Sequence, residues 1–214
     1  MTIKEILKDN WDKLSPQSRE NLEQAEVLID HFIDYFWDDY SSVVLPLFKA
    51  LERELYEICI NKYYKWAHDA EDIDEADDKR FQYVNNILAK RESFALGQVV
   101  QLIIAYLDNN NIYKIKDPFK KFLDDLPSAK KDDNSEVYKK ITYLCEEIDR
   151  TEERTYRTSR KREKNEEREK RIALKDYRNS CAHGSPNGIE IDMNAALDCL
   201  YRVPEIIKDL MEIF

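Results

Sequence analysis

Apolar side chains recur every three or four positions along much of this chain, the spacing that places them on one face of an α-helix. The first such stripe follows Ser15-Pro16, where serine is a favoured helix cap and proline a favoured first helical residue. A second stripe begins after Ser41-Ser42, which we expect to cap its helix, and this helix should end near Trp66. Its apolar positions are Val44, Leu47, Phe48, Leu51, Leu55, Ile58 and Cys59.

The second half of the chain shows the same spacing on both sides of one strongly polar stretch. Residues 135–148 carry an apolar stripe that predicts a helix, and Asp192 is expected to cap a last helix. Between them, residues 150–171 contain Tyr156 as their only large non-polar side chain. Glutamate and basic residues recur there at four-residue spacing, so we predict a long exposed helix, or two helices with a break. Further helical segments are expected over residues 81–91 and 93–107.

Composition supports a helical protein with a packed core. The 214 residues include only 3 glycines and 6 prolines, which leaves little room for the tight turns of β-hairpins. Charged residues make up 36% of the chain, yet 13 Tyr, 8 Phe and 3 Trp argue against disorder. We therefore predict a soluble all-α protein in which residues 1–214 form a single domain and residues 150–171 are a highly charged helical extension within it.

Charge and cysteine content narrow the classes of protein further. A net charge of −10 argues against a protein that coats nucleic acid non-specifically. The 4 cysteines are widely spaced and form no CxxC pair, so we interpret them as free thiols in a reducing cytoplasm. The N-terminus has no signal-peptide core, and the longest uncharged stretch, 15 residues from Ser93 to Leu107, is too short and too polar to span a membrane.

The strongest candidate for chemistry is the run Arg178-Asn179-Ser180-Cys181-Ala182-His183, followed directly by Gly184. Imidazole suits proton transfer because its ordinary pKa, about 6.5, lies near neutral pH. Arginine offers a planar, permanently charged fork for a phosphate. Together they suggest RNA cleavage, in which a 2′-hydroxyl loses a proton and a 5′-oxygen gains one. No set of metal ligands accompanies these residues in the sequence, so the predicted scheme is metal-free.

The helical geometry of this run limits how its side chains can meet. Asn179 and His183 are four residues apart and share a helix face, so Asn179 could orient His183 or hold a phosphate oxygen. Arg178 and His183 lie about 140° apart around the axis. Arg178 therefore either reaches forward along the helix or completes a site with a second copy of the motif from another subunit.

The pattern Arg-Asn-x-x-Ala-His-Gly resembles the signature of the HEPN superfamily, all-helical proteins that include many metal-independent ribonucleases. The resemblance implies a HEPN-like helical bundle that forms a homodimer, with two copies of the motif lining one cleft. It assigns catalytic roles to Arg178, Asn179 and His183 and implies an enzyme that needs no cofactor. The products of the metal-free reaction would carry a 2′,3′-cyclic phosphate. It also implies a toxin or a prokaryotic defence effector, with an antitoxin or another defence-system component as partner.

A structural reading of the same motif stays open beside the catalytic one. The run could be a helix C-cap, with Arg178 paired to an acid and His183 bonding the last carbonyl groups. The protein would then be a non-catalytic helical module that binds RNA or a protein partner. The one cluster of basic residues could contact RNA phosphates or could be a solvated helix face. Its residues are Arg154, Arg157, Arg160, Lys161, Arg162 and Lys164.

The remaining polar and aromatic features have plainer interpretations. Residues 69–78 carry seven carboxylates and are expected to be a solvated loop or frayed helix end; a metal site there lacks the glycine and spacing of a calcium loop. His31 and His68 are expected to be structural or exposed, and Cys181 to be a small buried residue. Trp66 is expected to belong to the core or an interface.

Overall fold

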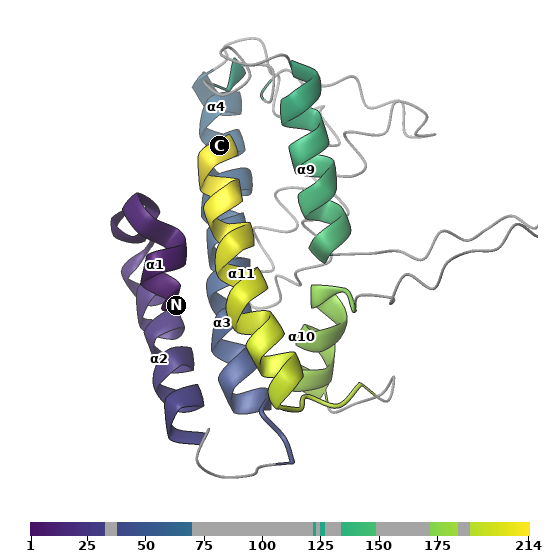
Figure 1. The fold of residues 1–214 in the computed structure, drawn as a ribbon. Coiled ribbons are helices and arrows are strands. Elements are labelled where there is room, and N and C mark those ends of the chain that lie inside the picture. Colours follow the sequence, from purple (N-terminus) through teal and green to yellow (C-terminus); the bar gives the residue numbers. More distant parts are fainter. Residues whose placement is uncertain (33–37, 70–121, 123–124, 127–133, 149–171, 184–188) are drawn as a thin grey trace, which may run out of the picture.

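The computed structural model describes residues 1–32, 38–69, 122, 125–126, 134–148, 172–183 and 189–214 (Figure 1). All regular structure within these ranges is helical, which confirms the all-α class for the described part of the chain. The elements are α1 (Ile3–Leu7), a 3₁₀ helix (Lys8–Lys13), α2 (Pro16–Phe32), α3 (Ser41–Leu55), a π-helical segment (Tyr56–Asn61), α4 (Lys62–Asp69), α9 (Asn134–Ile148), α10 (Leu174–His183) and α11 (Met193–Ile213).

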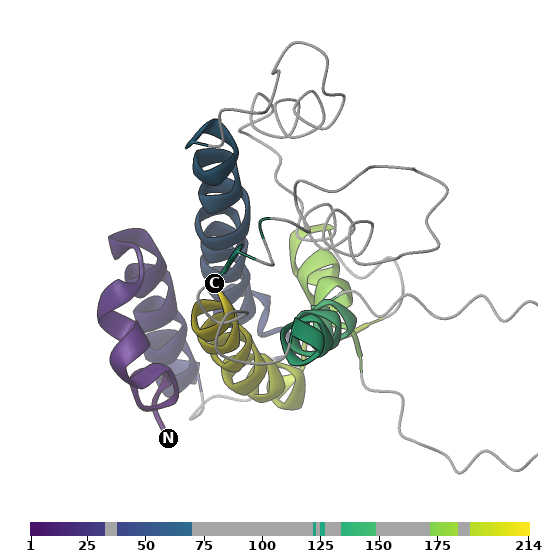
Figure 2. The same cartoon turned by 90° about the horizontal axis from the view of Figure 1, so that it is seen from above.

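Helix α3 is the element on which the others assemble. It packs against α2, α10 and α11, and α11 in turn packs against α1 and α9. Figures 1 and 2 show α1 and α2 on one side of α3 and α11, with α9 and α10 on the other. The side chains that α3 buries include Val43, Val44, Leu47, Phe48, Leu51 and Leu55.

The chain from residue 41 to residue 69 is helical throughout, as the second apolar stripe predicts, but it contains a π-helical segment. A π-turn holds more residues than an α-turn, so it shifts the phase of the side chains that follow. Ile58, Cys59 and Ile60 are consecutive and all buried within this segment. Beyond it, Trp66 stacks on Tyr63 with ring centroids 6.2 Å apart; Trp66 is half-buried and packs against the core.

The start of α3 differs from the expectation that Ser41-Ser42 caps it. Tyr40 is the N-cap residue, it makes no side-chain cap bond, and Ser41 is already the first helical residue. The helix starts earlier because the Asp39 carboxylate accepts the Ser41 amide at 2.8 Å and Tyr40 N donates to Ile191 O at 2.8 Å. The second bond ties the start of α3 to the segment that leads into α11.

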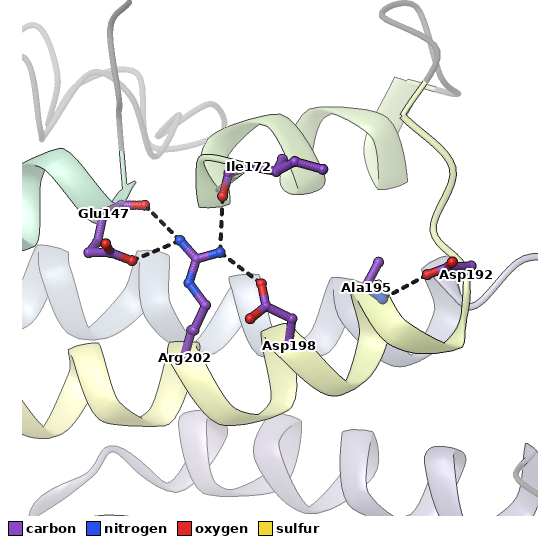
Figure 3. Close-up of polar contacts among 6 residues, drawn as sticks. All are labelled: Glu147, Ile172, Asp192, Ala195, Asp198 and Arg202. Carbon is purple, nitrogen blue, oxygen red and sulfur yellow. Dashed lines mark hydrogen bonds and ion pairs between the residues drawn. The ribbon is translucent and has the colours of Figure 1, made fainter. Parts of the chain in front are cut away.

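Two other predicted helix starts are confirmed by their capping bonds. The Ser15 hydroxyl accepts the Ser18 amide at 3.2 Å at the start of α2. Asp192 Oδ1 accepts the Ala195 amide at 2.8 Å at the start of α11 (Figure 3). The stripe predicted for residues 135–148 is also confirmed, because its described apolar residues are buried in the core. These are Ile141, Leu144, Cys145 and Ile148.

Several expectations fall outside the described residues. They are the acidic run beyond Asp69, the helices expected over 81–91 and 93–107, and the charged extension 150–171. The single-domain organisation stays a prediction. Within the described ranges, no helix is long and apolar enough to cross a membrane. All four cysteines are free thiols, as expected.

A buried arginine joins three elements next to the motif helix (Figure 3). Arg202 of α11 is 4% exposed, and its Nη1 donates to Asp198 Oδ2 at 2.8 Å and to Ile172 O at 3.0 Å. Its Nη2 donates to Glu147 Oε2 at 2.9 Å. Burial lowers the pKa of Arg202, but the bonds to Asp198 and Glu147 outweigh burial and raise it overall. Arg202 therefore stays charged and holds the end of α9 and the approach to α10 against α11.

Removing the guanidinium should weaken the fold strongly, because two carboxylates and a carbonyl would each lose a charged hydrogen-bond donor. We expect Arg202→Met to lower the free energy of unfolding by about 3–5 kcal/mol, the usual cost of breaking a buried ion pair. Denaturant unfolding followed by circular dichroism measures this change. Arg53→Met, at an exposed position of α3, is the control and should change the stability by less than about 0.5 kcal/mol. A loss below about 1 kcal/mol for Arg202→Met would show that the fold does not depend on this network.

Candidate active site on helix α10

The motif lies on α10, as the sequence predicts. Helix α10 runs from Leu174 to His183, so the whole run from Arg178 to His183 is helical. Leu174, Tyr177 and Ser180 are its buried residues, and α10 packs against α3, α9 and α11. One face of α10 therefore packs in the core. Its two ends differ in exposure, since Leu174 is buried and His183 is exposed. Gly184, the expected residue after the helix, lies outside the described residues.

Arg178 forms an ion pair with Glu52 of α3. Arg178 Nε donates to Glu52 Oε1 at 2.9 Å, and the two side chains are 21% and 18% exposed. The bond uses the Nε side of the guanidinium. Within the described part of the chain, the terminal Nη1 and Nη2 of Arg178 make no hydrogen bond. Arg178 is thus held by one edge, while its side chain keeps some access to solvent.

His183 and Asn179 occupy the more open part of α10. His183 is the last residue of the helix and is exposed, and Asn179 is half-buried. They share a helix face, as expected from their four-residue spacing. Among the described residues, no hydrogen bond joins the two side chains, so the orienting role of Asn179 stays a prediction.

The helix does not place Arg178 and His183 on one face. Arg178 reaches α3 through Glu52, whereas His183 is exposed at the helix end. This agrees with the angle of about 140° between positions five residues apart on an α-helix. A phosphate bound by Arg178 would need a His183 side chain that bends around the helix end, or a histidine from a second copy of the chain.

Cys181 is a poor nucleophile in this setting. Burial raises its pKa to about 11, the nearby Asp39 raises it as well, and a hydrogen bond involving Ser41 only partly offsets these effects. Its thiol is therefore protonated at neutral pH. Cys181 is half-buried and packs against the core, so it is less buried than the sequence suggested.

The other candidate residues give no second site within the described ranges. His31 is exposed near the end of α2, and the side chain of His68 lies outside the described residues. No group of three His, Cys, Asp or Glu residues that could hold a metal ion occurs in the described part of the chain. The basic residues also lie outside it; these are Arg154, Arg157, Arg160, Lys161, Arg162 and Lys164.

Sequence reasoning missed Glu52 and Arg202, although both leave a signal. Glu52 sits in α3 directly after Leu51 and three residues before Leu55, inside the apolar stripe. Arg202 directly precedes Val203 in the stripe of α11. A charge at the margin of an apolar helix face is seldom buried without a partner. That signal indicates an ion pair but does not identify the residue at its other end.

Comparisons of the chain with protein-family models, with curated proteins and with solved structures return no match. The resemblance to the HEPN superfamily therefore rests on the motif and on its place in a helical protein. What the structure adds is the environment of each motif residue on α10.

Proposed function

We propose that this protein is a metal-independent endoribonuclease of HEPN type, acting as a homodimer in the cytoplasm. The observation that carries the proposal is the state of the two key side chains on α10. Arg178 is anchored through Nε, its terminal nitrogens make no hydrogen bond to the described residues, and His183 is exposed at the helix end. A fixed cation and an accessible imidazole are the groups that cleavage of a phosphodiester requires.

The proposed reaction follows from the chemistry of these groups. A neutral imidazole accepts the proton of the RNA 2′-hydroxyl, and the resulting oxygen attacks the adjacent phosphorus. The bond from phosphorus to the 5′-oxygen breaks, and an imidazolium gives that oxygen a proton. Arg178 stabilises the negative charge on the phosphate oxygens. The products carry a 2′,3′-cyclic phosphate and a 5′-hydroxyl.

A dimer would supply both histidines that this scheme uses. The angle between Arg178 and His183 keeps one α10 from presenting both groups to one phosphate from the same face. Two copies of α10 facing each other would place two arginines and two histidines around one cleft, one histidine acting as base and the other as acid. A toxin or defence role, with an antitoxin or another defence protein as partner, belongs to the same proposal.

One observation favours a second candidate function, a non-catalytic helical module that binds RNA or a protein partner. The bond from Arg178 to Glu52 is the acid pairing that a structural role for Arg178 requires. In that case the pair fixes α10 against α3, and His183 has no chemical task. The two functions differ in whether RNA is cleaved when metals are removed.

Cleavage should therefore be tested with purified protein and a mixed RNA pool in EDTA. We expect cleavage of single-stranded RNA, and loss of at least about 100-fold in rate for His183→Ala, the usual contribution of a general acid or base. Arg178→Ala should be similarly impaired, because the phosphate charge would lose its stabilising cation. Gel analysis of the products, including the cyclic phosphate, is the measurement.

Matched controls exist for both substitutions. His31→Ala removes an exposed histidine from α2, and Arg53→Ala an exposed arginine from α3; both should cleave at the wild-type rate. Circular dichroism should show unchanged helix content in all four variants. Cleavage that survives loss of Arg178 and of His183 would exclude this site. Absence of cleavage by the wild type would favour the binding module.

The dimer is tested by mass and by complementation. The protein should have a mass near 51 kDa, twice the 25.6 kDa of the chain, by light scattering at micromolar concentration. If the roles divide between chains, mixing the inactive Arg178→Ala and His183→Ala chains should restore a small part of the activity, because a mixed dimer keeps one arginine and one of the two histidines. An active protein that is strictly monomeric would contradict the composite site.

If the cluster of basic residues from Arg154 to Lys164 binds RNA phosphates, it should contribute to RNA affinity. Replacing Arg154, Arg157, Arg160 and Arg162 by Gln deletes four charges and keeps helix propensity. If two of these side chains contact phosphates, the slope of log affinity against log salt should shrink by about 1.4, since each contact to a single strand contributes about 0.7. Filter binding over a range of salt concentrations measures the slope. An unchanged affinity and slope would identify the segment as a solvated face.

A further inference from the structure

Glu52 is the described residue that hydrogen-bonds the Arg178 guanidinium. It lies on α3 beside the buried Leu51, on the helix that packs against α2, α10 and α11. Its Oε1 accepts the Nε hydrogen of Arg178 at 2.9 Å, across 126 positions of sequence. The contact thus joins the central helix α3 to the helix that carries the motif.

The nitrogen that Glu52 binds determines which N–H donors of Arg178 are left to bind a phosphate. Arginine has five N–H donors, one on Nε and four on the two terminal nitrogens. The two terminal nitrogens form the end-on fork, which binds a phosphate through two parallel hydrogen bonds. Glu52 takes the single Nε donor, and in the described part of the chain it leaves this fork without a hydrogen bond.

We infer that Glu52 is a positioning residue that orients Arg178 so that its terminal nitrogens face an RNA phosphate. The inference rests on the proposed function, which it deepens by adding a residue that the motif does not contain. A carboxylate that occluded Arg178 would be expected to take the end-on fork instead. With 21% of its side chain exposed, Arg178 is partly accessible while its Nε edge stays fixed.

Three variants distinguish an effect of Glu52 on the orientation of Arg178 from an effect of its charge and from an effect on the stability of the fold. Glu52→Ala removes the acceptor, whereas Glu52→Gln keeps an oxygen that can accept the Nε hydrogen and removes the charge. Glu23→Ala, at an exposed position of α2, is the control for loss of a carboxylate. Each variant is measured for RNA cleavage in EDTA, for Kd with a non-cleavable 2′-O-methyl RNA oligonucleotide, and for thermal unfolding.

We expect Glu52→Ala to lower kcat by about 10- to 100-fold, because a small displacement of a catalytic cation has effects of this size. KM should change much less, because other contacts hold the rest of the strand. Glu52→Gln should stay within about 3-fold of the wild type, since the hydrogen bond survives at reduced strength. In an Arg178→Ala background, Glu52→Ala should leave the Kd for the non-cleavable strand unchanged, because Glu52 acts through Arg178.

The outcomes distinguish this inference from the proposed function. Faster cleavage or tighter binding by Glu52→Ala would show that the carboxylate occludes Arg178, and an equal loss in Glu52→Gln would show that charge matters more than orientation. Either result overturns positioning, as would a lower melting temperature with a normal rate. A wild type that does not cleave, but binds the non-cleavable strand in a way that needs both Glu52 and Arg178, overturns the nuclease and leaves the positioning role standing. A wild type that neither cleaves nor binds overturns both.

Discussion

The burial of α3 is the interaction on which the rest of the structure depends. This helix packs against α2, α10 and α11, so one helix supplies part of several interfaces. Fully burying a Val, Leu or Phe side chain stabilises a fold by about 1.5–3 kcal/mol, and α3 buries a long series of them. Because α3 packs against α2, α10 and α11, it links the motif helix to the rest of the core.

Polar contacts at the margins of α3 fix the orientation of its neighbours. Glu54 is 2% exposed and accepts the Ser15 amide at 3.1 Å, which holds the start of α2 against α3. Tyr40 bonds the Ile191 carbonyl beside α11, and Glu52 bonds Arg178 on α10. Apolar packing has little directional preference, whereas these hydrogen bonds define the position and rotation of each helix.

Two ion-pair networks of different character lie on and beside the motif helix: Arg178 pairs with Glu52, and Arg202 pairs with Asp198 and Glu147 and bonds the Ile172 carbonyl just before α10. Arg202 is buried, charged and bonded to acceptors from three segments, so we expect it to stabilise the fold. The pair between Arg178 and Glu52 is partly exposed, so water screens it and its contribution to stability is small. Within the described part of the chain, Nε is the nitrogen of Arg178 that makes a hydrogen bond.

The sequence by itself determined the helical class, most of the described helix positions and the residues of the motif. Periodic apolar positions and caps such as Ser15 and Asp192 act over a few residues, so local spacing reveals them. The angle between Arg178 and His183 is likewise a property of one helix. The HEPN assignment and the chemistry that follows from it stay proposals.

Only the tertiary structure identified the partners of the motif. Glu52 precedes Arg178 by 126 positions, and Glu147 precedes Arg202 by 55, distances over which helical periodicity carries no information. The cap of α3 also changed for a tertiary reason, because the bond from Tyr40 to Ile191 helps to fix the chain before Ser41. Which charges meet depends on how the helices pack, and packing is decided by the whole apolar core at once rather than by any single segment.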